Sequence, residues 1–177
     1  MNEIELVKRA VRGDEQAFSA LIKAQGEKLY KTAFLYVRNK EDALDVVQET
    51  AYKAFLSISG LKNPEYFGTW LIKILIRCSY TLLNKRKKSF LPGDDVINAF
   101  LDSADIPPQS CQDLPTALEK LEGNYRTVII LFYYHDWPIK SIAEAMEKPE
   151  GTVKTYLRRA RLELKTILKE VPHEQMG

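Results

Sequence analysis

Apolar residues recur at steps of three and four along most of this chain, and no long stretch alternates apolar with polar residues. The clearest run lies near the C-terminus, at Val153, Leu157, Ala160, Leu164 and Leu168. Steps of three and four place side chains on one face of an α-helix, whereas alternation is typical of a half-buried strand. The spacing therefore predicts an all-α protein.

A stretch of 25 residues, 89–113, interrupts this pattern. It holds five aspartates, no lysine or arginine, and three of the eight prolines of the chain. Proline and a block of like charges both disfavour a packed helix, so we expect a flexible acidic linker. The chain then divides into two small helical domains, residues 1–88 and 114–177, which is compatible with a length of 177 residues.

Several classes of protein are disfavoured by composition. The longest apolar run, Val128 to Phe132, is far shorter than the ~20 residues of a membrane span, and the first residues lack the apolar core of a signal peptide. Cys78 and Cys111 have no metal-ligand spacing and form no disulfide framework. We find no nucleotide-binding, zinc-protease or serine-hydrolase motif. We therefore expect a cytoplasmic protein that is not an enzyme, with no metal, no cofactor and no small-molecule substrate.

Caps and breakers outline three helices in the first domain. One is expected over residues 15–38, with Gly26 as a candidate interruption; a second runs through Ile58, and a third covers residues 66–88. The signals that begin or end them are Asp14, Asn39 with Asp42, Gly60, and Asn63 followed by Pro64. The apolar residues expected to be buried by the second helix are Leu44, Val47, Ala51, Ala54, Phe55 and Ile58.

The second domain is predicted to hold shorter helices. Pro115 suits the first turn of one helix, Asn124 is expected to cap the next over residues 125–135, and Trp137 with Pro138 breaks it. A brief helix over residues 139–147 and a longer one from Pro149 onward complete the domain.

Residues 139–165 have the order of a helix-turn-helix, which is a short helix, a tight turn and a longer basic helix. One helix of such a motif lies in the major groove of DNA while the other braces it. The positions expected to pack inward are Ile142, Ala143, Val153, Leu157 and Ala160. The outward positions are Lys154, Thr155, Arg158, Arg159 and Arg161, which can donate to bases and phosphates. A basic face can also be the solvated side of an ordinary helix, but the order of elements favours DNA contact.

The segment PEGTVKTYLRRARLELK, residues 149–165, resembles the last helix of extracytoplasmic-function sigma factors, and SIAEAMEK before it resembles the first helix of their helix-turn-helix. Glu147 stands where that family usually has a turn glycine, and Lys148 where it often has an apolar residue. We therefore expect a looser turn or a left-handed Glu147. The resemblance implies contact with the −35 promoter element by Thr152, Lys154, Thr155, Arg158, Arg159 and Arg161.

The first domain carries a second resemblance to the same family. DALDVVQET, residues 42–50, is similar to the region 2 helix that docks on RNA polymerase, which implies that Leu44, Asp45, Gln48 and Glu49 bind the polymerase. From spacing alone, Asp45, Gln48 and Glu49 form a polar stripe that a solvated helix face would also explain.

FGTWLIKILIRCSYTLLNKRKK, residues 67–88, is similar to the helix that follows and reads the −10 element. The resemblance implies −10 contact by Lys62, Asn63, Tyr66, Trp70, Lys73, Arg77, Lys85 and Arg86. The loop over residues 61–66 would hold a flipped base, with Asn63 as its hydrogen-bonding residue. Phe67 and Trp70 can equally belong to the core. Arg77, Thr81 and Asn84 depart from the pattern of the family, which leaves the −10 sequence preference open.

Together these features predict an alternative sigma factor that binds core RNA polymerase and promoter DNA. The resemblance also implies an anti-sigma partner, which in this family can be membrane-anchored, and a role in stress or envelope response. Two other readings remain open at this point. One is a free-standing helix-turn-helix regulator whose residues 1–88 sense or dimerise, and the other is a protein-interaction module such as a decoy for an anti-sigma factor.

Overall fold

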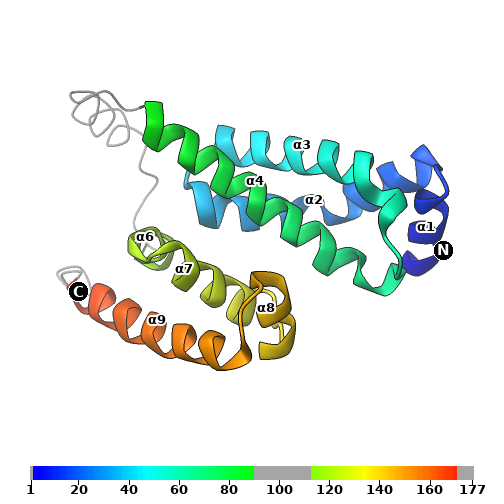
Figure 1. Ribbon diagram of the computed structural model, residues 1–177. Helices are drawn as coiled ribbons and strands as arrows, with labels where there is room; N and C mark the ends of the chain where they lie inside the picture. Colours follow the sequence, from blue (N-terminus) through cyan, green and yellow to red (C-terminus); the bar gives the residue numbers. More distant parts are fainter. Residues whose placement is uncertain (1, 90–112, 171–177) are drawn as a thin grey trace, which may run out of the picture. The chain divides into compact units, whose positions relative to one another are not determined.

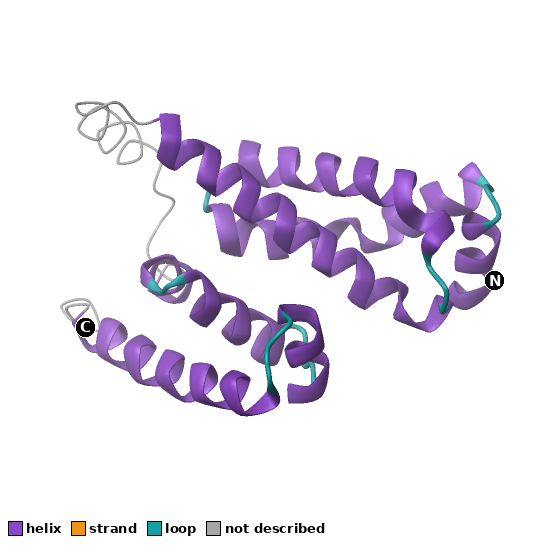
Figure 2. Cartoon of the chain, viewed as in Figure 1, coloured by secondary structure: helices purple, strands orange, loops and turns teal. Residues whose placement is uncertain are grey.

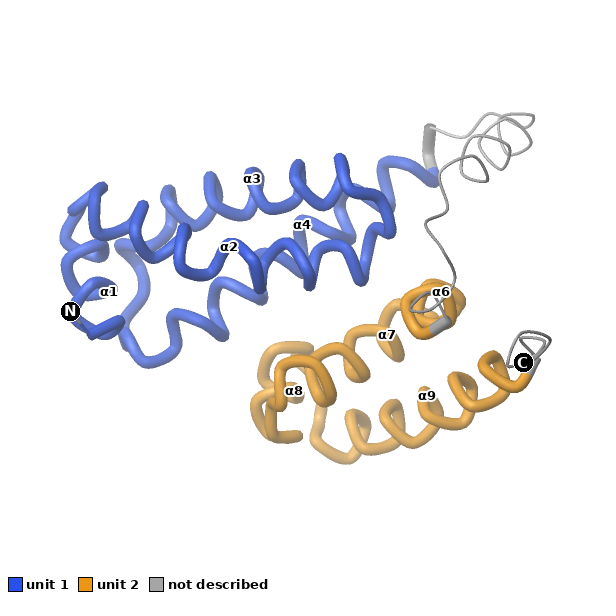
Figure 3. Tube along the Cα trace, turned by 180° about the vertical axis from the view of Figure 1, so that it is seen from behind, with its two compact units in different colours: residues 1–90 blue, residues 91–177 orange. Residues whose placement is uncertain are grey.

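The computed structural model describes residues 2–89 and 113–170. All regular structure in these two ranges is helical, as Figure 2 shows, which confirms the all-α prediction. The chain forms two compact units, residues 1–90 and 91–177 (Figure 3). The predicted linker lies almost wholly outside the described residues.

Three long helices form the body of the first unit, and a short one lies at one end (Figure 1). The helices are α1 (Glu3–Val11), α2 (Glu15–Val37), α3 (Lys40–Ser57) and α4 (Phe67–Ser89). Two 3₁₀ turns, η1 (Ile58–Gly60) and η2 (Pro64–Tyr66), join α3 to α4. Helices α2, α3 and α4 pack on one another. The largest side chains in this core are Leu21, Leu29, Tyr36, Val46, Phe67, Leu71 and Leu75.

Local signals place the ends of these helices. An oxygen of Asp14 accepts a hydrogen bond from the Ala17 amide at 3.0 Å, and that of Asn39 accepts one from the Asp42 amide at 3.0 Å. Both predicted N-caps are confirmed. The expected interruption at Gly26 is wrong, because α2 continues through it; one glycine costs only about 1 kcal/mol in a helix that is packed elsewhere.

Helix α3 buries a different face from the one expected. Its buried residues are Ala43, Val46, Thr50 and Ala54, whereas Leu44 and Phe55 are exposed. Only Ala54 and, just after the helix, Ile58 match the predicted core. Small residues let α3 approach α2 and α4 closely, and the buried hydroxyl of Thr50 is satisfied by the Val46 carbonyl at 2.6 Å. The prediction was wrong because α3 carries two apolar series and only contacts with distant helices select between them.

The second unit consists of shorter helices arranged around a helix-turn-helix. They are α6 (Asp113–Lys120), α7 (Gly123–Ile129), the π-helical turn η3 (Ile130–Tyr134), α8 (Ile139–Met146) and α9 (Glu150–Glu170). Every inward position predicted for the motif is buried. Asn124 is not the cap of α7, because the helix already begins at Gly123.

The buried guanidinium of Arg126 ties α7 to α6. Its Nε donates to the Leu118 carbonyl at 2.9 Å, and one terminal nitrogen donates to the Glu119 carbonyl at 2.6 Å. These carbonyls belong to the last turn of α6, which leaves acceptors without intrahelical partners. One side chain therefore caps α6 and fixes it beside the helix-turn-helix.

Candidate nucleic-acid and protein interfaces

The turn between α8 and α9 closes tightly although it contains no glycine. Glu147 has φ 55° and ψ 43°, which is left-handed, so that part of the prediction is confirmed. The Lys148 amide donates to the Ala143 carbonyl at 3.0 Å, as in helix ends closed by glycine. Ile142 and Ala143 stay buried beneath it. The departure from the family pattern is thus accommodated by backbone strain rather than by a looser turn.

Helix α9 presents a basic outer face. Lys154, Arg158 and Arg159 are exposed, whereas Thr152 and Thr155 are half-buried. The Thr155 hydroxyl donates to the Gly151 carbonyl at 3.0 Å, within the helix. The exposed cations start within a turn of the first residue of α9, where a recognition helix contacts base edges.

Arg161 differs from the other predicted −35 residues because its guanidinium is held within the unit. Its Nε donates to the Tyr133 hydroxyl at 2.5 Å. Its charge lies 5.4 Å from the centroids of both the Phe132 and Tyr133 rings, a distance typical of a cation–π contact. Arg161 therefore braces α9 against η3, and a phosphate contact has to compete with these partners.

The loop before α4 exposes two of the predicted −10 residues. Tyr66 is 62% exposed and Lys62 is exposed as well. The Asn63 side-chain oxygen accepts from the Glu65 amide at 3.1 Å. Phe67 is buried, and the half-buried Trp70 packs beside it with ring centroids 6.0 Å apart. Phe67 is therefore a core residue, while Trp70 has one part in the core and one part accessible.

Basic residues follow along α4. Lys73 is half-buried, and Arg77, Lys85 and Arg86 are exposed. Arg86 forms an ion pair with the carboxylate of Asp42 at the start of α3. Burial raises the pKa of Asp42, opposed by the charge of Arg86. Arg86 thus ties α4 to α3, a role that the sequence reading did not include.

All four predicted polymerase-binding residues lie on the exposed side of α3. Leu44 is 53% exposed, and Asp45, Gln48 and Glu49 are exposed too. The same side continues with Tyr52 and Leu56, each more than 60% exposed, and with Phe55. The sequence reading missed these three aromatic and aliphatic side chains. The sequence of α3 contains more large apolar residues than one helix face can bury, and this excess was the signal that could have revealed them.

No group of three histidine, cysteine, aspartate or glutamate side chains in the described part of the chain could hold a metal ion. None of the helices in residues 2–89 or 113–170 combines the length and the hydropathy that a membrane-spanning helix requires.

Comparison with known proteins identifies the class. Residues 21–89 match the family model of sigma-70 region 2, and residues 111–164 match that of sigma-70 region 4. The chain is 40% identical over 131 residues to RNA polymerase sigma factor SigV of Bacillus subtilis, covering 74% of this chain and 78% of SigV. It is 25% identical over 179 residues to ECF sigma factor SigW of the same organism, covering 93% and 96%.

Solved structures show the same fold. CnrH, solved in complex with the cytosolic domain of CnrY, superimposes with a TM-score of 0.72 at 22% identity, over 96% of this chain and 99% of that one. RpoE of Bartonella quintana, solved with the anti-sigma factor NepR, gives 0.64 at 24% identity, over 89% and 98%.

The chain is therefore a sigma-70-type subunit of RNA polymerase. Within that class it belongs to the extracytoplasmic-function (ECF) sigma factors. It is an alternative sigma factor, and the reading as a free-standing regulator is not favoured. The named relatives are sigma factors rather than enzymes.

Proposed function

We propose a division of labour between the two units. Residues 1–88 bind core polymerase and capture the −10 element, residues 114–177 bind −35 duplex, and residues 89–113 join them. The observation that carries this proposal is that α9 has two different faces. One face buries Val153, Leu157 and Ala160, and the other exposes the cationic side chains of Lys154, Arg158 and Arg159. A helix seated by one face and basic on the other is suited to the major groove.

For the −35 element, we assign base and phosphate contact to the exposed cations of α9. Arginine reads guanine with two hydrogen bonds, and lysine and threonine hold phosphates. Arg158 and Arg159 are the strongest candidates, because neither is engaged as Arg161 is. Thr152, Lys154 and Thr155 complete the surface. Arg161 contributes indirectly, because its contacts with η3 hold α9 in position.

For the −10 element, we assign base capture to the loop before α4 and backbone contact to the cations of α4. Exposed aromatic rings bind unstacked bases, and a basic track follows the phosphates. Tyr66 and the accessible part of Trp70 provide rings, and Asn63 provides amide hydrogen-bonding groups. The basic track consists of Lys62, Lys73, Arg77, Lys85 and Arg86.

For the polymerase, we assign docking to the exposed side of α3. An apolar strip bordered by Asp45 and Glu49 suits a partner with apolar and basic side chains, since apolar contacts supply affinity and charges supply orientation. Leu44, Tyr52, Phe55 and Leu56 form this strip, and the exposed amide of Gln48 adds a hydrogen-bonding group beside it. An anti-sigma factor that covered it would keep the protein from the polymerase, and we propose such a partner for this chain.

We also propose that the protein acts in the cytoplasm, where its DNA and polymerase partners reside, and that it has no catalytic activity of its own. The polymerase supplies the chemistry, so the chain needs only binding surfaces. The side chains assigned above bind bases, phosphates or protein, and none requires a metal or cofactor for that purpose.

In vitro transcription with purified core polymerase on a genomic library tests the proposal and yields the promoter sequence. Replacing Arg158 and Arg159 by alanine should lower transcription about tenfold or more from promoters with an intact −35 element, because one good bidentate base contact contributes about 1–3 kcal/mol. The matched control replaces Lys165 and Lys169, which are exposed cations later in the same helix. An equal loss in both double variants would refute specific −35 reading by α9.

A second assay addresses docking. Replacing Leu44 and Leu56 by serine should weaken the binding of core polymerase by about tenfold or more, because burying an apolar side chain is worth about 1.5–3 kcal/mol. Replacing the exposed residues Glu5 and Glu15, which lie off α3, by alanine is the control. Unchanged polymerase affinity in the leucine variant would remove α3 as the docking helix.

A further inference from the structure

Helix α1 lies outside the surfaces proposed to bind DNA and polymerase. It covers Glu3–Val11 and precedes residues 21–89, the stretch matched by the region 2 model. None of the residues assigned to DNA or polymerase lies in it. Yet Val7 is fully buried and Ala10 nearly so, so α1 is an integral part of the first unit.

The partners of α1 indicate what it does. Besides its neighbour α2, the helix packs against η1 and η2, the two turns of the loop between α3 and α4. Figure 1 shows α1 at the same end of the unit as this loop, although about fifty residues separate them in the sequence. Ile58 of η1 is buried at this end. The loop assigned to −10 capture therefore rests on α1.

Local hydrogen bonds shape the loop. The Leu61 amide donates to the Ile58 carbonyl at 3.0 Å, and the Tyr66 amide donates to the Asn63 carbonyl at 3.1 Å. The Glu65 amide donates to the Asn63 side chain at 3.1 Å. Each bond joins residues two or three apart, so it shapes the loop without placing it on the bundle. Placement depends on packing: η1 packs on α3, η2 packs on α4, and α1 packs on both turns from outside the α3–α4 segment.

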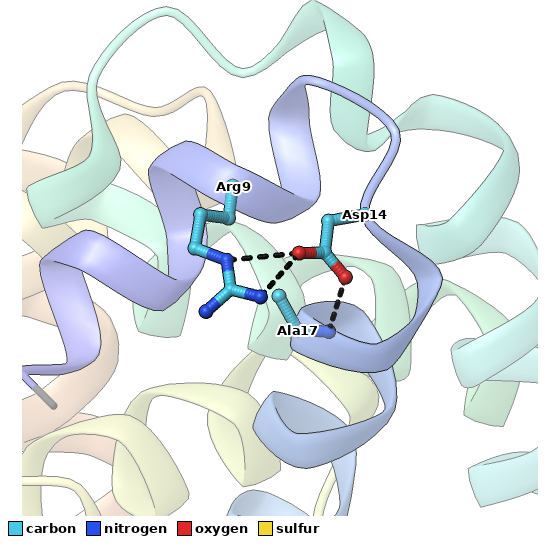
Figure 4. Close-up of polar contacts among 3 residues, drawn as sticks. All are labelled: Arg9, Asp14 and Ala17. Carbon is cyan, nitrogen blue, oxygen red and sulfur yellow. Dashed lines mark hydrogen bonds and ion pairs between the residues drawn. The ribbon is translucent and has the colours of Figure 1, made fainter.

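Helix α1 is itself anchored at both ends. Near its C-terminus, Nε and Nη2 of Arg9 lie 2.8 and 2.6 Å from one oxygen of Asp14, whose other oxygen caps α2 at Ala17 (Figure 4). Near its N-terminus, Gln25 of α2 donates to Glu3 at 3.3 Å. These contacts fix the direction of α1 on α2, so the helix can transmit a defined position to the loop.

We propose that α1 is a positioning element for −10 recognition and that Val7 is its central positioning residue. The proposal rests on the proposed function of the loop. Hydrogen bonds weaken steeply as distance and angle depart from their optimum. A loop displaced slightly on the bundle would therefore lose discrimination between bases before it lost its fold.

The test measures base discrimination by the reconstituted holoenzyme. The probes are two fluorescent forked DNAs, one with the −10 element selected from the genomic library and one with its most strongly discriminated base replaced. The readout is the ratio of the two dissociation constants, which does not depend on how much of the protein is active. Val7→Ala tests α1, and Asn63→Ala tests the loop.

Val46→Ala is the matched control. Val46 is 1% exposed and Val7 0%, so both changes remove the same buried methyl groups from the same unit. Val46 lies in the second turn of α3, about 18 Å along the helix from η1. Core polymerase affinity is measured separately for each variant, so that a docking defect is recognised.

We expect Val7→Ala and Asn63→Ala each to lower the discrimination ratio by about threefold or more. Complete loss of one hydrogen bond that distinguishes the bases would lower the ratio by about fivefold, since such a bond contributes about 1 kcal/mol. Val46→Ala should leave the ratio unchanged. If Asn63→Ala lowers the ratio and Val7→Ala does not, α1 has no positioning role and the proposed function stands. If neither lowers it, the loop does not read the base and both proposals fail. Equal losses for Val7→Ala and Val46→Ala would show general loosening and overturn the inference.

Should Val7→Ala fail to fold, Arg9→Ala replaces it, because Arg9 is partly exposed and its loss opens no core cavity. The expected change has the same direction and is smaller. An unchanged ratio in a folded Arg9→Ala holoenzyme, beside a lowered ratio in Asn63→Ala, counts against the inference.

Discussion

At the scale of single residues, backbone strain is concentrated at turns. In residues 2–89 and 113–170, the residues other than glycine with positive φ are Arg38, Asp136 and Glu147. A side chain in this region costs about 1 kcal/mol relative to glycine. Glu147 is the position that closes the helix-turn-helix, so this strain lies next to the helix that we propose reads DNA.

Replacing Glu147 by glycine should therefore stabilise the second unit by about 0.5–1 kcal/mol, because glycine adopts φ 55° without a steric penalty. The free energy of unfolding in denaturant measures this. Glu144→Gly is the control: Glu144 lies within α8, where glycine should instead destabilise by about 1 kcal/mol. A loss of stability in Glu147→Gly would contradict the argument.

The carboxylate of Asp14 contributes to stability through its negative charge. Its hydrogen bond from the Ala17 amide, and then that from Arg9, lower the pKa of its carboxyl from the ordinary value of 3.8. A lowered pKa in the folded state means that the unfolded state binds the proton more tightly. The stabilisation is therefore fully present above pH 3.8 and is lost as the pH falls through the lower folded value.

Comparison with Asp14→Asn isolates this charge, since asparagine can still cap α2. The wild-type protein should be the more stable at neutral pH, and the difference should shrink below about pH 4. Unfolding followed across this range measures the difference. A difference independent of pH would show that the negative charge of Asp14, with its contacts to the Ala17 amide and to Arg9, contributes nothing to stability.

At the scale of elements, an ion pair links two helices of the first unit in addition to their core packing. Arg86 near the end of α4 pairs with Asp42 in the first turn of α3. Burial raises the pKa of Asp42, so the folded state binds its proton more tightly than the unfolded state does. This carboxyl therefore contributes less stability as the pH rises through its folded pKa, and the Arg86 charge offsets part of that loss.

Arg86→Ala should destabilise the first unit by about 1 kcal/mol at neutral pH, a value reduced for the partial exposure of the pair. The loss should become smaller as the pH falls through the raised pKa of Asp42 and its carboxyl is protonated. Lys87→Ala, which removes an exposed neighbouring cation, is the control. Equal destabilisation by the two variants at pH 7 would argue against a specific link between α4 and α3.

At the scale of the whole molecule, the two units each have a core of their own. Each also carries one tryptophan, Trp70 in the first and Trp137 in the second. Fluorescence of single-tryptophan variants therefore reports on one unit at a time. Small units with separate cores unfold as separate cooperative transitions unless their interface couples them.

Arg126→Ala leaves the carbonyls at the end of α6 without their charged donor and should destabilise the second unit by about 2–3 kcal/mol. The unfolding transition reported by Trp137 should shift to lower denaturant, and that reported by Trp70 should stay in place. A parallel shift of both transitions would mean that the units unfold as one body.

Much of the architecture follows from signals that act over a few residues. Apolar spacing predicted the helices, the side chains of Asp14 and Asn39 set two of the starts, and the motif over residues 139–165 predicted its own buried positions. Such signals are readable because helix formation and capping depend on neighbours within about four residues. Helix α1 was not anticipated, although Asn2 caps it and its end charges favour it.

Tertiary structure decided which of these surfaces remain available. On α3, packing buried the face that contains Val46 and left the face that contains Leu44 exposed. Contacts within each unit hold two predicted DNA-binding residues, because Arg86 pairs with Asp42 and Arg161 donates to Tyr133. Packing also placed α1 beside the loop before α4. None of these outcomes is local, because each depends on a partner in another helix or turn, beyond the reach of about four residues over which capping and helical spacing act. A periodic apolar pattern predicts that a helix has an apolar face. Where a helix has more than one such face, only the neighbours packed against it determine which face is buried.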